Sequence, residues 1–189
     1  DITIKGSNVR FVATHLESLW DENKVPKSAE QARQLVKDLQ DTKSPIVVIG
    51  DFNADPRDPR PKGYPNPGDQ PVASEKCAAG SSLCNAYKVM RDAGFTDSGP
   101  DASEPASFTW GMNALLTGPD PVRAKVAAEM GNKNGFTDRL DYIFVKNGIS
   151  VVTSKIIGQR PPYGSDHAGV VSQLQISAEG SVISKALDS

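Results

Sequence analysis

The chain has 189 residues, of which 38% are hydrophobic and 23% charged, a balance typical of one globular domain with a sizeable core. Its 23 acidic and 21 basic residues give a net charge of -2, which excludes a general electrostatic attraction to nucleic acid or to anionic membranes. No apolar run approaches the roughly 20 residues that a membrane-spanning helix needs. Any binding of phosphate groups must therefore depend on a local site.

The first part of the sequence predicts a strand, a helix and a second strand. Residues 8–16 alternate in the manner of a strand and carry His15 near the end. Ser28 and Gln31 have the spacing of a capping box, and the apolar residues that follow share one face of a helix. Residues 45–49 form a continuous apolar run, as expected of a strand that is buried on both faces.

The middle of the sequence is less regular. Residues 55–71 hold six of the 14 prolines, which excludes a regular helix or central strand and predicts a long surface loop. Residues 82–93 predict a short second helix, and residues 107–110 predict a short strand. We expect residues 112–135 to form an irregular or partly helical insertion.

Three further strands are expected in the last part of the chain. They cover about residues 139–145, 149–157 and 168–176. Asn147 and Gly148, between the first two of these strands, predict a hairpin turn. Strands and helices together indicate an α/β fold.

Four short segments place polar side chains at the ends of apolar strands, where layered α/β proteins build their sites. These segments are residues 14–17, 50–53, 138–142 and 165–167. Singly, each has an ordinary explanation: His15 could be a core histidine, and Asp141 could be a structural acid paired with Arg139. Together they hold the groups that attack of water on a phosphate ester requires: carboxylates for a hard cation, an amide for a phosphoryl oxygen and an imidazole for protons.

The order of these segments resembles the second half of the endonuclease/exonuclease/phosphatase family, from about residue 8 to residue 177. The matching stretches are THL at 14–16, GDFNADP at 50–56, DRLDYIF at 138–144 and GSDH at 164–167. The family includes pancreatic-type deoxyribonucleases, apurinic-site endonucleases, bacterial sphingomyelinases and inositol polyphosphate 5-phosphatases. The resemblance implies a half or incomplete version of its two-sheet α/β sandwich, with a mixed sheet flanked by helices. Residues 1–177 would be the C-terminal portion of one such domain, and residues 178–189 a tail.

The resemblance also implies roles for the residues of the first two segments. His15 would contact the phosphate. Asp51 would orient the water or contact a metal ion, and Asn53 would donate a hydrogen bond to the scissile phosphate.

The last two segments would supply the proton-handling group. His167 would be the general base or would stabilise the phosphate, with Asp141 as its orienter, and Asp166 would be a carboxylate of the metal site. An oxygen-rich site of this kind suits a hard cation, so the implied cofactor is Mg²⁺ or Mn²⁺, with Ca²⁺ as a further possibility.

The sequence departs from the family at its beginning. In the family, an Asn and a metal-binding Glu lie in an N-terminal half, many dozens of residues before the segment that contains His15, whereas only 14 residues precede His15 here. Glu17 lies too close on the same strand to replace that Glu. We expect the chain to supply about one sheet of the sandwich, with its apolar inner face covered by its own missing N-terminal half or by a second copy.

The leading interpretation is a divalent-metal-dependent phosphoesterase of the phosphodiesterase or nuclease type. Its substrate would be nucleic acid, a phospholipid headgroup or a small phosphodiester, and the isolated chain would be inactive or nearly so. The alternative is a catalytically inactive half-domain that acts as a binding or interaction module. A serine hydrolase fits poorly, because the sequence has no G-x-S-x-G elbow.

Two cysteines, Cys77 and Cys84, lie close together in a polar stretch. A disulfide between them would close a short loop, worth roughly 2.5 kcal/mol by chain entropy, and would suit a secreted or periplasmic protein. The alternative is a pair of free thiols in a cytosolic chain. A zinc site is disfavoured, because the chain has only two histidines and neither is near the pair in sequence.

Overall fold

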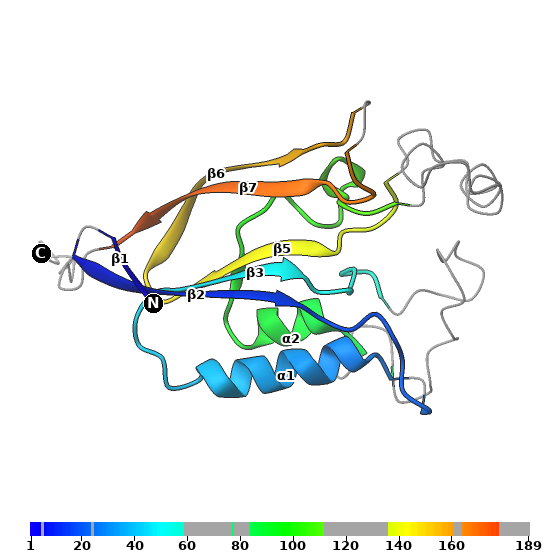
Figure 1. The fold of residues 1–189 in the computed structure, drawn as a ribbon, viewed down its shortest axis with the longest axis horizontal. Coiled ribbons are helices and arrows are strands. Elements are labelled where there is room, and N and C mark those ends of the chain that lie inside the picture. Colours follow the sequence, from blue (N-terminus) through cyan, green and yellow to red (C-terminus); the bar gives the residue numbers. More distant parts are fainter. Residues whose placement is uncertain are drawn as a thin grey trace, which may run out of the picture.

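The computed structural model describes residues 1–4, 6–23, 25–58, 77, 84–111, 136–160 and 164–177, and the statements below refer to these residues. They form a layer of two helices, a five-stranded sheet and a two-stranded sheet (Figure 1). Neither of these helices is long and apolar enough to span a membrane. Residues 59–71 of the loop expected over residues 55–71, the insertion expected over 112–135 and the tail expected over 178–189 lie outside the described residues.

The five-stranded sheet brings the expected strand ends together. In sheet order its strands are β1 (Ile2–Ile4), β2 (Ser7–His15), β3 (Ile46–Asp51), β5 (Asp141–Lys146) and β4 (Thr96–Asp97). Strands β2 and β3 are parallel, and β5 is antiparallel to β3. In this register His15 pairs with Asp51, and Asp51 pairs with Asp141.

One face of this sheet packs against the two helices and forms the main core. The helices are α1 (Lys27–Leu39) and α2 (Ala86–Asp92). Val48 and Phe144 point from the sheet into this core, where they meet Ala32 of α1 and Met90 of α2, all almost fully buried. Phe52, directly after β3, is fully buried in the same cluster, which anchors the loop that follows Asp51.

The first helix is confirmed, but the expected capping box is wrong. The helix is capped by Pro26 without a side-chain hydrogen bond, and Ser28 lies buried inside the first turn. The side-chain oxygen of Gln31 instead accepts a hydrogen bond from the amide of Glu17 at 2.7 Å. Gln31 thus ties α1 to the loop after β2, which a local spacing rule could not predict.

The second helix is shorter than expected. It begins after Asn85, whose side-chain oxygen accepts from the amide of Lys88 at 3.1 Å. The Asn85 side chain is fully buried and donates to the carbonyls of Asp55 and Asp58 at 2.7 and 2.9 Å. One residue therefore caps α2 and fixes the loop after β3.

The second sheet confirms the two last expected strands and corrects the expected hairpin. It consists of β6 (Ile149–Ile157) and β7 (Gly169–Ile176), paired antiparallel with a bulge at Val152. Asn147 and Gly148 have φ values of 59° and 76°, as a tight turn requires, but β5 pairs with β3 and β4 while β6 pairs with β7. The turn instead carries the chain from one sheet to the other, and the Asn147 side chain donates to the carbonyls of Thr42 and Ser44.

The expectation of a single sheet with an uncovered inner face is wrong for part of that face. Val9, Val47 and Val145 are buried there, beneath apolar side chains of β6 and β7. Further along the same face, Phe11 and Ile49 remain 43% and 39% exposed. The described chain therefore holds parts of both layers of a sandwich, with one region of the inner face open.

Candidate active site

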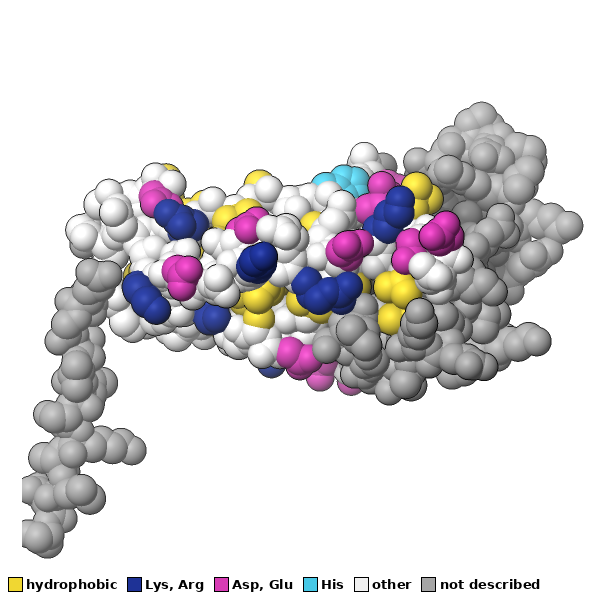
Figure 2. Space-filling view, turned by 90° about the horizontal axis from the view of Figure 1, so that it is seen from below, with side chains coloured by type: hydrophobic (Ala, Val, Ile, Leu, Met, Phe, Trp, Pro, Cys, Tyr) yellow, Lys and Arg dark blue, Asp and Glu magenta, His cyan; other side chains and the backbone are white. Residues whose placement is uncertain are grey.

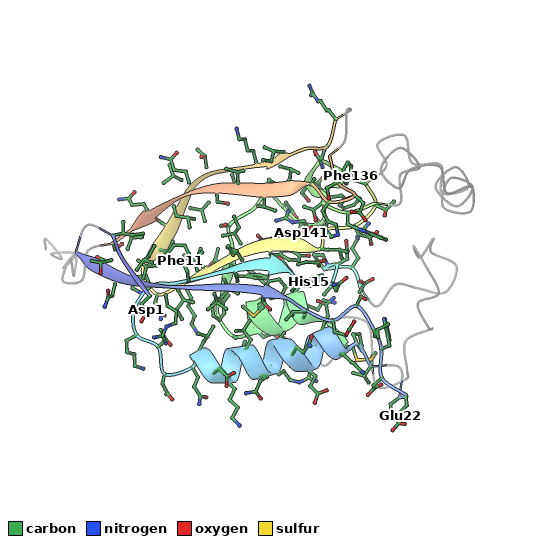
Figure 3. The ribbon with its side chains drawn as sticks, viewed as in Figure 1. Asp1, Phe11, His15, Glu22, Phe136 and Asp141 are labelled. Atoms are coloured by element: carbon green, nitrogen blue, oxygen red, sulfur yellow. A yellow bond between two sulfur atoms is a disulfide. The ribbon has the colours of Figure 1, made fainter. Side chains whose placement is uncertain are left out.

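Three side chains of the candidate site come from neighbouring strand ends. His15 is the last residue of β2, Asp51 is the last of β3, and Asp141 is the first of β5. The register places the three side by side along one edge of the sheet, and Figure 3 shows His15 and Asp141 near each other where these strands end or begin. This edge is where the sequence analysis expected them.

The fourth side chain, His167, comes from the other sheet. It lies two residues before β7, where it forms an isolated bridge with Trp110. Its Nδ1 atom is 2.9 Å from Oδ2 of Asp141, which is a hydrogen bond, and its Nε2 atom is 3.9 Å from Oδ2 of Asp51. The same Asp51 oxygen lies 3.4 Å from Nε2 of His15. The Asp51 carboxylate thus lies between two imidazoles.

The electrostatics of the site favour positive charge beside its carboxylates. Burial is the largest cause that raises the pKa of Asp51, and the nearby Asp141 carboxylate adds to it. The hydrogen bond to Asp141 is the largest cause that raises the pKa of His167, which partial burial opposes. A proton or a cation between these groups is therefore stabilised.

Asn53 holds the loop after β3 in place. Its backbone has a positive φ of 45°, and its amide N–H donates to Oδ1 of Asp51 at 2.8 Å. Its side-chain amide donates to the carbonyl of Leu16, also at 2.8 Å. The hydrogen bond from the Asn53 amide closes an Asx turn at Asp51, and the same hydrogen bond orients the Asp51 carboxylate.

The structure gathers three of the described residues as potential metal ligands. One donor atom from each of Asp51, Asp141 and His167 lies within 4.8 Å of the others. Asp166 is not part of this group: its carbonyl accepts from Gly111, and its carboxylate lies 3.5 Å from the Ser165 hydroxyl. The two carboxylates supply the oxygen ligands that a hard divalent cation prefers, and the imidazole is a third donor beside them.

The alternative pairing of Asp141 with the guanidinium of Arg139 is not what the structure shows. Arg139 is fully buried, its Nε donates to the backbone carbonyl of Asp141 at 2.8 Å, and its Nη2 lies 3.3 Å from Asp97. The carboxylate of Asp141 is thus left to His167. Arg139 supports the site through the backbone.

Two residues support the site in ways that the motifs did not indicate. The Thr109 hydroxyl accepts from the amides of Leu140 and Asp141, both at 3.0 Å. The Ser165 hydroxyl accepts from the amide of His167 at 3.0 Å. Both act on the backbone of a site segment, a contact that only the three-dimensional arrangement reveals.

Fold and site together define a layered α/β protein with an acidic, imidazole-bearing site where its strands end. The sequence matches the profile of the Endonuclease/Exonuclease/phosphatase family over residues 3–167. The chain belongs to this family. No curated protein matches the sequence.

Solved structures share the fold at low sequence identity. A family protein from Leptotrichia buccalis superposes with a TM-score of 0.52 and 18% identity, over 93% of this chain and 52% of that one. A family protein from Bacteroides vulgatus gives 0.51 and 19%, over 88% and 50%. A humanized TDP2 from D. rerio gives 0.50 and 18%, over 92% and 57%. The chain thus spans about half the length of the structures it matches.

Proposed function

We propose that this chain supplies the general base and the phosphate-binding residues of a divalent-metal-dependent phosphoesterase. The observation that carries the proposal is the position of the Asp51 carboxylate between the imidazoles of His15 and His167. The other ring nitrogen of His167, Nδ1, is hydrogen-bonded to Asp141. Family membership supports a phosphate ester as the substrate class.

His167 is the proposed general base. Because Asp141 accepts the hydrogen bond from Nδ1, the imidazole is held in the tautomer that leaves Nε2 free of its proton. That nitrogen faces the Asp51 carboxylate, which can accept the second hydrogen of the same water. Asp51 would then orient the water, and His167 would take its proton.

His15 and Asn53 are the proposed phosphate contacts. The His15 side chain is 75% exposed at the open end of β2, so a ligand can reach it. The side-chain amide of Asn53 donates to the carbonyl of Leu16, which holds it close to Asp51. In the proposed reaction the water oxygen forms a bond to phosphorus, the bond from phosphorus to the ester oxygen breaks, and the alcohol leaves with a proton.

Asp51 is the proposed ligand of a divalent cation that the gathered group supports, with Mg²⁺ or Mn²⁺ as the cation and Ca²⁺ as a further candidate. Asp166 is proposed beside it on the family resemblance alone, because its carboxylate lies outside that group. A cation bound there would neutralise charge on the phosphate and lower the pKa of a bound water. The raised pKa of Asp51 is consistent with this assignment, because a buried carboxylate beside a second acid is stabilised by a cation.

The substrate is proposed to bind through this site rather than through a broad basic surface. On the helix-bearing face in Figure 2, basic and acidic side chains alternate instead of gathering by sign. Nucleic acid, a phospholipid headgroup and a small phosphodiester share the phosphodiester group that such a local site would recognise.

We propose that residues 1–177 are the C-terminal portion of one domain, completed by a further polypeptide. The support is the open inner face at Phe11 and Ile49, together with coverage of about half of each matched structure. The complement would be the chain's own N-terminal half or a second copy, and it would add the Glu ligand. The alternative is a half-domain without activity that binds through this face.

We also propose an oxidising compartment, outside the cell or in the periplasm. Cys77 and Cys84 form a disulfide with a Cα–Cα distance of 5.4 Å. Disulfides of this kind persist mainly in such compartments.

The proposed function is tested by hydrolysis of bis-p-nitrophenyl phosphate with Mg²⁺, Mn²⁺ or Ca²⁺. The natural polypeptide that contains these residues should be active, and His167→Ala should lower its rate by about 10²–10⁴-fold. Asp92→Asn, an exposed acid on α2, is the matched control and should keep the rate. The 189-residue chain alone should be nearly inactive. If the natural polypeptide shows no hydrolysis with any of the three cations, the enzyme proposal is wrong and the binding module is favoured.

A further inference from the structure

The contact between Asp141 and His167 joins two different sheets. Asp141 begins β5 of the five-stranded sheet, whereas His167 precedes β7 of the two-stranded sheet. Among the described strands, no ladder of hydrogen bonds pairs one sheet with the other. The distance between the two side chains must therefore be set by something else.

A connecting segment, residues 108–111, links the two sheets at this end. Trp110 bridges both to Asp138 and to His167. On one side the amides of Thr109 and Trp110 donate to the carbonyl of Asp138, at 2.7 and 2.9 Å. On the other side the carbonyl of Thr109 accepts from the amide of Ala168 at 2.6 Å.

Thr109 also reaches the site with its side chain. The hydroxyl accepts from the amides of Leu140 and Asp141, both at 3.0 Å, and the residue is fully buried. One residue therefore holds the amide of Asp141 with its hydroxyl and the residue after His167 with its carbonyl. Buried hydrogen bonds of this kind hold geometry firmly, because losing one leaves a buried amide without a partner.

We propose that Thr109 is a positioning residue that sets the hydrogen bond between Asp141 and His167. Its hydrogen bonds go to the two backbone segments that carry these side chains, and it acts through those segments. Its importance for catalysis rests on the proposed function, while its effect on the hydrogen bond does not. In an active form of the protein, loss of the hydroxyl would lower the rate on the order of a hundredfold, as small misplacements of catalytic groups do.

The test compares Thr109→Val, which keeps the shape and removes the hydroxyl, with Thr109→Ser, which keeps the hydroxyl. The readout is the proton on Nδ1 of His167, followed by nuclear magnetic resonance in the chain with isotope-labelled histidine. The chain has only two histidines, and a His15→Ala variant assigns them. The wild type and Thr109→Ser should show this proton protected from exchange with water, and Thr109→Val should lose the signal.

Ser98→Ala is the matched control, because Ser98 is also buried and also links the two sheets, through its hydrogen bonds with Ser172. It should keep the His167 signal. The proposal is overturned if Thr109→Val keeps the signal, if Thr109→Ser loses it, or if Ser98→Ala loses it as well.

A second measurement on the wild type does not depend on how the variants fold. Amide exchange should show the amides of Asp141 and Ala168 protected, since each donates to Thr109. Exchange of either amide as fast as in an unfolded peptide would contradict the proposal. Absence of phosphoesterase activity would change neither result, so the two proposals fail separately.

Discussion

At the scale of single residues, the candidate site depends on one imidazole and the two carboxylates around it. The Nδ1 atom of His167 is hydrogen-bonded to Asp141, and its Nε2 atom faces Asp51. The resemblance implies that Asp141 orients His167, and the two side chains lie within hydrogen-bonding distance, 2.9 Å apart. Nothing in the sequence indicated that His15 would face the same Asp51 oxygen as His167, because that contact depends on strand register.

Asp141→Asn should lower the pKa of His167. The hydrogen bond to the Asp141 carboxylate is the largest cause of the raised pKa, and an amide cannot stabilise the imidazolium in the same way. The measurement is a titration of the His167 ring signals with metal removed. Asp92→Asn serves as the control and should leave the titration unchanged, whereas an unchanged pKa in Asp141→Asn would show that the contact does not form in solution.

The raised pKa of His167 also predicts how stability depends on pH. The folded protein binds this proton more tightly than the unfolded chain, so the contribution is complete below the ordinary imidazole pKa of 6.5 and is lost as pH rises through the raised value. The free energy of unfolding should therefore fall just above pH 6.5, measured with denaturant in the presence of a chelator. The pKa of Asp51 is also raised, from the ordinary 3.8, so its contribution to the free energy of unfolding falls with rising pH as well. A fall of the same size in Asp141→Asn would contradict the assignment to His167.

At the scale of helices and strands, periodicity predicted most elements but not their partners. The runs that became β2, β3, β5, β6 and β7 were recognisable from apolar pattern alone. The turn at Asn147 is present, but the hairpin predicted from it is wrong. A turn motif specifies backbone angles and does not specify that the two strands it joins pair with each other. The capping box predicted from Ser28 fails for a similar reason, because the side chain of Gln31 instead accepts a hydrogen bond from the neighbouring loop.

Gly50 shows why one position near the site accepts only glycine. Its φ is 151°, and an added Cβ would overlap the carbonyl oxygen of Thr14 on the neighbouring strand. Gly50→Ala should therefore lower the free energy of unfolding by about 1–3 kcal/mol, the usual cost of overpacking. Gly164→Ala, where an added Cβ meets no atom within 4 Å, is the control for denaturant unfolding. Equal stability of the two variants would show that β2 and β3 do not approach each other this closely.

At the scale of the whole molecule, the open inner face is the feature that composition could not reveal. The resemblance implies that the chain lacks a partner for its sheet, whereas β6 and β7 form a second layer over part of that sheet. Which side chains stay uncovered depends on where this second sheet ends. Along β2, Phe11 lies between the buried Val9 and His15 at the end of the strand (Figure 3), so the exposed part of this face lies between the buried cluster and the site.

The open face should bind a hydrophobic dye in the isolated chain. Phe11→Asp should reduce dye fluorescence, because Phe11 is 43% exposed and lies on the same face of the sheet as the buried cluster around Val47. Val171→Asp, at a residue 40% exposed on β7, is matched in exposure and should reduce it less. Equal reductions would indicate that the face beside Phe11 is no more hydrophobic than the rest of the surface.

The central claim is that water attacks a phosphate ester at the site formed by Asp51, Asp141 and His167. It is tested most directly by hydrolysis of bis-p-nitrophenyl phosphate in water labelled with heavy oxygen, using the natural polypeptide and Mg²⁺. The label should enter the phosphate product and not the nitrophenol. The rate of hydrolysis should be largely lost in the His167→Ala variant. Label in the nitrophenol, or an undiminished rate in the variant, would contradict it.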